Sequence, residues 1–175
     1  MSDNKSNNKS NNKVRLMITS ASMMAIVFVT TFINFTVPLG VGKGCLVHLG
    51  AASAVAVAFM LPPLWAGLSA GLGMCLFDFL SGWVMWAPFT LIIRFAQIYI
   101  LSKYIRKNDS KFNLVLGFSL SFLIDVCGYY LAESIIYLNL VTPLANIPAE
   151  MGLNIGGIII GYALISVLRG LKIKF

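Results

Sequence analysis

The stretch KYIRKNDSK, residues 103–111, interrupts an otherwise apolar region and decides how the chain crosses a membrane. It is one of three segments rich in Lys and Arg. The basic residues of these segments are Lys5, Lys9, Lys13 and Arg15, then Lys103, Arg106, Lys107 and Lys111, and finally Arg169, Lys172 and Lys174. Cytoplasmic segments of membrane proteins carry an excess of Lys and Arg. All three segments therefore lie on the cytoplasmic side if an even number of spans separates them.

The composition supports a membrane protein. Of the 175 residues, 58% are hydrophobic and 11% are charged, and the mean hydropathy is +0.85. Soluble domains carry about 25% charged residues. The net charge of +7 comes from residues clustered between apolar runs, not interleaved with exposed aromatic residues, which favours a role in topology over nucleic-acid binding.

Hydropathy read over about 20 residues predicts six spans. They cover residues 16–35, 45–61, 64–81, 87–102, 112–138 and 151–168. Six spans place all three basic segments on one side, so we predict an all-α integral membrane protein, a compact bundle of six transmembrane helices with cytoplasmic N- and C-termini. Residues 1–13, rich in Asn, Lys and Ser, are expected to form a disordered cytoplasmic tail, and residues 14–175 a single transmembrane domain. The expected location is the bacterial cell membrane.

Small residues recur at four-residue spacing in several spans. Gly67 and Gly71 in the third span and Gly157 and Gly161 in the sixth have the GxxxG spacing of close helix packing. Ala21 and Ala25 in the first span, within ASMMA, have the same spacing. Packing inside the chain explains such pairs, and docking on another membrane protein explains them equally for an outward-facing helix.

The motifs of catalysis are missing from the sequence. It has one histidine, no HExxH or GxSxG motif, and three cysteines without metal-binding spacing. GVGKGC, residues 40–45, departs from the phosphate-loop pattern because Gly44 stands where Ser or Thr is needed and Val37 where the first Gly is needed. We therefore predict no catalytic residue, no metal site and no cofactor, and a flexible external loop over residues 36–44.

Two charged residues lie deep in the predicted bundle. At about 1.5 Å per residue, Arg94 and Asp125 both lie inside the membrane, and the long Arg side chain can reach toward Asp125. A charge at the bilayer centre costs about 2.5–3.5 kcal/mol. Arg94 therefore pairs with Asp125 and anchors its helix, or it contacts a bound ligand such as a carboxylate or phosphate.

Polar and aromatic residues gather in the outer halves of three spans, which is typical of a small-molecule site. The candidate ligand-binding residues are Trp86, Thr90, Tyr130, Glu133, Tyr137 and Asn154, with His48 and Arg94 in addition. Tyr130, Glu133 and Tyr137 recur at i, i+3 and i+7 and so share a helix face. An aromatic belt at the membrane interface is the alternative interpretation. Asp78, at the external end of the third span, is expected to have a structural role.

The order and spacing of several motifs resemble the substrate-binding S components of energy-coupling factor (ECF) vitamin transporters. The motifs are ASMMA (21–25), VPLGVGKGCLVHLG (37–50), PPLWAGLSAGLGMCLFDFLSG (62–82), WAPFTLIIR (86–94), YYLAE (129–133) and IPAEMGLN (147–154). The resemblance implies a six-helix bundle that binds a vitamin near its external face, under the first external loop. It also implies that Ala21 and Ala25 dock on a transmembrane coupling subunit that is bound to two cytoplasmic ATPase subunits, and that the S component topples in the membrane during transport. Arg94, Asp78 and Glu133 resemble the pattern of S components for hydroxymethylpyrimidine or pyridoxine.

Three functions follow as hypotheses. The first is capture of a small vitamin or precursor without catalysis, with hydroxymethylpyrimidine or pyridoxine as the best candidates and pantothenate or riboflavin as alternatives. The second is a self-sufficient proton- or ion-coupled carrier in which Arg94, Asp125 and Glu133 form a relay. The third is a scaffold that only assembles with other membrane proteins.

Overall fold

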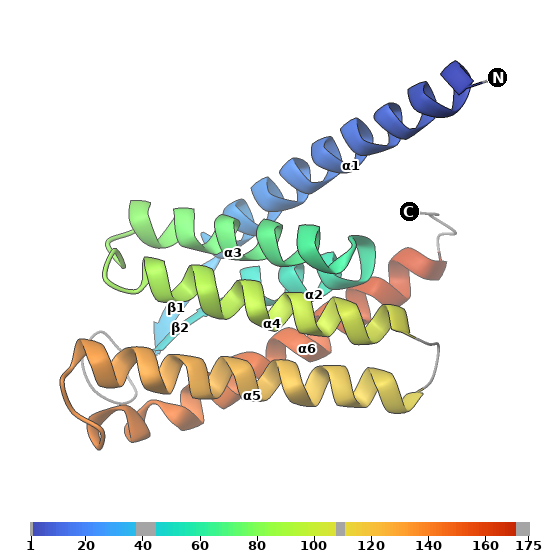
Figure 1. The fold of residues 1–175 in the computed structure, drawn as a ribbon. Helices are drawn as coiled ribbons and strands as arrows, with labels where there is room; N and C mark the ends of the chain where they lie inside the picture. The colour runs from blue at the N-terminus through green and yellow to red at the C-terminus, as the bar shows by residue number, and fades with distance from the viewer. Residues whose placement is uncertain (1, 38–44, 108–110, 171–175) are drawn as a thin grey trace.

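The computed structural model of the protein describes residues 2–37, 45–107 and 111–170 (Figure 1). The helices are α1 (Ser2–Thr31), α2 (Gly50–Met60), α3 (Pro63–Leu80), α4 (Ala87–Lys107), α5 (Lys111–Ile136) and α6 (Ile147–Gly170). Two short strands, β1 (Asn34–Val37) and β2 (Cys45–His48), lie between α1 and α2, and a 3-10 helix, η1 (Thr142–Ala145), precedes α6.

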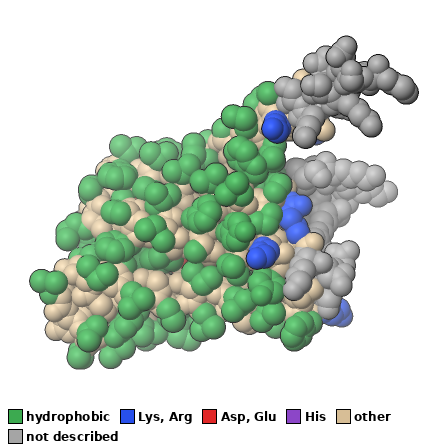
Figure 2. All heavy atoms as spheres, in the orientation of Figure 1, with side chains coloured by type: hydrophobic (Ala, Val, Ile, Leu, Met, Phe, Trp, Pro, Cys, Tyr) green, Lys and Arg blue, Asp and Glu red, His purple; other side chains and the backbone are tan. Residues whose placement is uncertain are grey.

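The helices run back and forth along one direction. The start of α1, the end of α4, the start of α5 and the end of α6 lie at one end of the molecule, and the strands, the α3–α4 turn and η1 lie at the other (Figure 1). Figure 2 shows hydrophobic side chains along the length of the bundle and Lys and Arg gathered at the end that holds the termini. The prediction of an all-α membrane bundle is confirmed. By the positive-inside rule, the end with the termini is cytoplasmic.

Within the described residues, four helices are long and apolar enough to cross a bilayer: Asn11–Thr31 of α1, α3, α5, and Ile147–Leu164 of α6. The helix α4 is also long, with 21 residues, but it carries the buried polar side chains of Arg94 and Gln97. The helix α2 has only 11 residues, about 16 Å, although residues 45–61 were expected to form a full span. Its last turn is held by α4, where the Ser102 hydroxyl donates to the Leu61 carbonyl at 2.8 Å and Arg106 donates to the Met60 carbonyl at 3.0 Å.

The prediction for residues 45–61 was wrong at its start because residues 45–48 form a strand. β1 and β2 pair in antiparallel register, with Asn34 opposite His48 and Thr36 opposite Leu46. A short apolar run such as CLVH has the same hydropathy in a strand as in a helix, so periodicity alone does not separate the two. Residues 38–44, most of the predicted external loop, lie outside the described residues.

The N-terminal tract also differs from the prediction of a disordered tail. The backbone of α1 is helical from Ser2 onward, so residues 2–13 continue the first membrane helix. Figure 1 shows this part of α1 extending beyond the other helices at the cytoplasmic end.

Gly82 and Gly161 stand where a larger residue would strain the backbone or overlap a neighbouring helix. Gly82, in the α3–α4 turn, has a φ of +82°, the left-handed conformation that glycine adopts without strain. The turn folds Trp83 back so that its backbone N–H donates to the Asp78 carbonyl at 3.0 Å. Gly161 of α6 lies directly against α2, since a Cβ added there would lie 2.6 Å from Val55 Cβ and 2.9 Å from the Ala52 carbonyl oxygen. The predicted GxxxG packing at Gly161 is therefore internal to the chain.

Replacing Gly161 with alanine is expected to destabilise the bundle by about 1–3 kcal/mol, because the added methyl group overlaps α2. The matched control is Gly156→Ala in the same helix, where an added Cβ meets no described atom within 4 Å. Both substitutions raise helix propensity by the same amount, so the difference between their unfolding midpoints reports the packing of Gly161 against α2. Thermal unfolding of the purified variants in detergent measures this difference, and equal midpoints would contradict the close contact.

Candidate ligand-binding site

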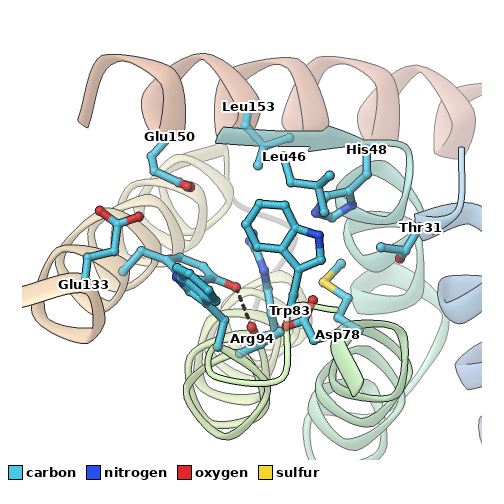
Figure 3. Close-up of a pocket in the computed structure, with 13 residues that line it drawn as sticks. Thr31, Leu46, His48, Asp78, Trp83, Arg94, Glu133, Glu150 and Leu153 are labelled. Atoms are coloured by element: carbon cyan, nitrogen blue, oxygen red, sulfur yellow. Dashed lines mark hydrogen bonds between the residues drawn. The ribbon is translucent and has the colours of Figure 1, made fainter. Parts of the chain in front are cut away.

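A cavity of about 60 Å³ lies at the external end of the bundle, opposite the basic residues (Figure 3). Its walls come from five helices, the strand β2 and the α3–α4 turn. The lining residues are Thr31, Leu46, His48, Met74, Asp78, Trp83, Trp86, Thr90, Arg94, Tyr129, Glu133, Glu150 and Leu153. They bring together aromatic rings, hydroxyl groups and charged groups, which is the usual composition of a site that orients a small ligand.

The carboxylates surround the aromatic centre of the cavity. Figure 3 shows Glu133 on α5 and Glu150 on α6 at one side, and Asp78 on α3 at the other, with the Trp83 indole between them. Glu133 also accepts a hydrogen bond from the Asn146 amide at 2.8 Å, which ties α5 to the residue just before α6. The Trp86 ring lies 5.3 Å from the Trp83 ring in an edge-on arrangement.

Arg94 forms the inner wall of the cavity and is only 3% exposed. Its Nη1 lies 2.5 Å from Asp125 Oδ1 and donates to Gln97 Oε1 at 2.8 Å. Its guanidinium carbon lies 5.0 Å from the centre of the Tyr129 ring, within the range of a cation–π interaction. The Tyr129 hydroxyl in turn donates to Thr90 Oγ1 at 3.2 Å.

The ion pair belongs to a closed ring of four side chains. The Gln97 amide donates to Asn154 Oδ1 at 3.1 Å, and the Asn154 amide donates to Asp125 Oδ2. The ring links α4, through Arg94 and Gln97, to Asp125 of α5 and Asn154 of α6. The predicted pairing of Arg94 with Asp125 is confirmed. Arg94 also lines the cavity, so the pairing with Asp125 leaves the same side chain beside the space that a ligand would occupy.

Two residues of the cavity wall each have a nitrogen atom without a partner in the described ranges of the chain. Arg94 Nε and His48 Nδ1 are buried and have no hydrogen-bond partner within the described part of the chain. Burial, together with the nearby Arg94 charge, lowers the pKa of His48, in the hairpin outside the membrane-spanning helices, to about 3. The imidazole is therefore neutral at pH 7 and adds no positive charge to the site.

Five of the eight predicted site residues line the cavity: His48, Trp86, Thr90, Arg94 and Glu133. The other three do not. The Tyr130 hydroxyl donates to the Leu140 carbonyl at 3.0 Å. The Tyr137 ring packs behind Trp86, with 6.4 Å between ring centres.

Asn154 is the third predicted residue that lies outside the cavity wall, because it takes part in the buried ring with Asp125. The predicted span began at residue 151, but α6 begins at Ile147. Asn154 consequently lies two turns inside the helix, and Glu150 occupies the outer level that was assigned to Asn154.

Sequence reasoning overlooked Tyr129 and Glu150 and gave Asp78 only a structural role. A signal for Tyr129 was present, because Asp125, Tyr129 and Glu133 recur at intervals of four residues and all three are buried. That face, rather than the one through Tyr130, points into the bundle. Trp83 was not among the predicted site residues, and only the turn at Gly82 brings it into the cavity.

The predicted docking residues lie on the outside of the bundle. Ala21 and Ala25 are both exposed, and the same side of α1 carries the exposed Ile18 and Val29. This apolar stripe agrees with a surface that contacts lipid or another membrane protein.

The fold and the cavity together define a multi-pass membrane protein that encloses a small polar and aromatic site at its external end. A model of the family described as ECF-type riboflavin transporter, S component, matches residues 11–170. The chain belongs to this family and is a substrate-binding membrane protein rather than an enzyme. It therefore resides in the bacterial cell membrane.

A solved structure described as the S component of a bacterial ECF transporter has the same fold. The TM-score is 0.62 at 19% sequence identity, with 91% of this chain and 96% of that chain covered. No curated protein sequence matches this chain.

Breaking the Arg94–Asp125 pair is expected to destabilise the fold strongly. Asp125→Asn leaves the Arg94 charge buried without its partner, at a cost of about 3–5 kcal/mol. The double variant Arg94→Met, Asp125→Asn should recover part of that loss, since no uncompensated charge remains. Chemical denaturation in detergent measures the wild type, Arg94→Met, Asp125→Asn and the double variant, with Lys103→Met at the exposed end of α4 as the control. Additive losses in the double variant would show that the two groups are not coupled.

Proposed function

We propose that this protein is the S component that captures a small vitamin or vitamin precursor outside the cell for ATP-driven uptake. The single observation that carries the proposal is the position of the cavity, which lies at the end of the bundle opposite the basic, cytoplasmic residues. A ligand bound there is taken from the external side. Family membership supports the same role.

The chemistry of the cavity favours a one-ring heteroaromatic ligand, with hydroxymethylpyrimidine or pyridoxine as the best candidates. Trp83, Trp86 and Tyr129 provide aromatic surfaces, and Thr90 and His48 provide hydrogen-bonding groups. The volume of about 60 Å³ is small beside the 300–1,000 Å³ of sites for drug-sized ligands. Hydroxymethylpyrimidine and pyridoxine each have one ring, whereas riboflavin, the vitamin in the family's description, has three fused rings. Riboflavin and pantothenate are the alternatives.

Uptake in this proposal depends on partner proteins. The exposed stripe of α1 around Ala21 and Ala25 would dock on a transmembrane coupling subunit, which would bind two cytoplasmic ATPase subunits. Small side chains allow two helices to approach closely, and membrane helices associate through such contacts.

One vitamin or precursor is expected to stabilise the purified protein against heat. A ligand at 100 times its Kd contributes about 2.7 kcal/mol to the folded state. Trp86→Ala should strongly reduce the shift given by that ligand, because the cavity loses one of its three aromatic surfaces. Tyr130→Phe is the control, because its hydroxyl bonds the Leu140 carbonyl outside the cavity. A thermal-shift screen with hydroxymethylpyrimidine, pyridoxine, riboflavin and pantothenate makes the measurement, and no shift with any vitamin would favour a scaffold.

A bulky residue on the proposed docking stripe is expected to block assembly with the coupling subunit without changing ligand binding. Ala21→Trp should abolish co-purification with the coupling subunit and leave the ligand-induced thermal shift unchanged. Ile26→Trp is the matched control, since Ile26 is also exposed on α1 but lies about 140° around the helix from Ala21. Undiminished co-purification of Ala21→Trp would contradict this docking surface. Accumulation of ligand in liposomes without partner subunits, abolished by collapse of the proton gradient, would instead indicate an independent carrier.

A further inference from the structure

Carboxyl groups outnumber basic groups in the wall of the cavity. Three carboxylates line it, those of Asp78, Glu133 and Glu150, against one guanidinium, that of Arg94. The charge of Arg94 is already matched by Asp125, which lies behind the cavity wall. The site as a whole therefore favours positive charge in whatever it binds.

Two of the three carboxyl groups are also buried. Asp78 is 8% exposed and Glu133 is 7% exposed. A carboxylate taken out of water loses much of its solvation, and this loss is offset by hydrogen bonds, by an opposite charge or by uptake of a proton. A cation that enters the cavity restores that balance, whereas an anion adds to the repulsion.

The arrangement of the carboxylates also restricts the shape of the ligand. Figure 3 shows Glu133 and Glu150 on one side of the Trp83 ring and Asp78 on the other. A flat ring beside the indole could direct N–H groups to both sides. Cations and N–H-bearing rings interact favourably with the faces of Trp and Tyr.

Arg94 supplies an independent indication of a ligand. Its side chain is 96% buried, it lines the cavity, and its Nε–H has no hydrogen-bond partner among the residues that the structure describes. A buried donor without an acceptor costs free energy, so this group matches an acceptor atom on a bound molecule. The ligand thus presents one acceptor inward and its donors outward.

We propose that the cavity selects a flat heteroaromatic cation, an amine- or amidine-bearing ring that gives N–H groups to the carboxylates of Asp78, Glu133 and Glu150 and accepts from Arg94 Nε. This inference rests on the proposed function and specifies its substrate class. Of the two best candidates, it favours hydroxymethylpyrimidine, which carries an amidine, over pyridoxine. It also separates the chain from a receptor for an uncharged ring system such as riboflavin, and from a receptor for acids or phosphate esters.

The test compares ligands that share one ring and differ in charge. Pyridoxamine carries an ammonium group where pyridoxine carries a hydroxyl and 4-pyridoxic acid a carboxylate. A second pair is 4-amino-5-hydroxymethyl-2-methylpyrimidine and its 4-oxo analogue, which lacks the amidine. Calorimetric titration of the purified full chain should show the amine or amidine member of at least one series binding about tenfold or more tightly than its uncharged partner.

Charge-removing variants of the same size test the assigned groups. Glu133→Gln and Asp78→Asn should each weaken binding of the cationic probe by about tenfold and reduce its preference over the uncharged probe. Tyr130→Phe should change neither quantity. The ratio of the two affinities is the decisive readout, because a general loss of folded protein lowers both affinities and leaves the ratio unchanged.

The outcomes separate the two proposals. Preferential binding of the amine or amidine probes, reduced in the two variants, supports a cationic ligand. Equal or tighter binding of the uncharged or anionic probes overturns it, as does a site that takes riboflavin alone, and both results leave the S-component function intact. Binding of no probe and no vitamin overturns the cationic ligand and the proposed function together.

Discussion

The ion pair between Arg94 and Asp125 is the interaction on which the external half of the bundle depends. Two ionised groups in the apolar interior are tolerated only when each satisfies the other and their remaining hydrogen-bonding groups find partners. Here Gln97 and Asn154 complete the ring, so α4, α5 and α6 are joined at one level. Apolar contacts between membrane helices allow sliding and rotation, whereas directed polar bonds specify one register. The buried ring thereby sets the rotation of the three helices that carry much of the cavity wall.

Arg94 both joins the helices and lines the cavity. Nη1 of its guanidinium contacts Asp125 and Gln97, while the side chain lines the cavity and Nε has no hydrogen-bond partner among the described residues. The residue that orders the helices is therefore also the innermost polar group of the proposed site. A ligand that accepts from Nε would engage a group already held in place, which lowers the ordering cost of binding. Tyr129 is likewise held in place before a ligand binds, because its ring lies near Arg94 and its hydroxyl donates to Thr90.

Prediction from sequence succeeded for features that depend only on distance along a helix axis. Arg94 and Asp125 were paired from their depths alone, and depth follows directly from residue number along a helix. It failed where helix rotation mattered. The face through Tyr130 was chosen from a local pattern of aromatic residues, although the inward face of α5 runs through Asp125 and Tyr129. Asn154 was placed too far out because the start of α6 was set four residues late, at 151 rather than 147.

Composition and the spacing of basic residues were sufficient by themselves to determine that this chain is a membrane bundle with its ends on the cytoplasmic side. Both properties depend on counts and intervals along the chain, which folding leaves unchanged. Tertiary structure alone decided that residues 45–48 pair with 34–37 instead of extending α2, and that Trp83, Asp78 and Glu150 meet in one cavity. Those features depend on contacts between residues far apart in sequence, and only the packed helices determine which side chains come within reach of each other.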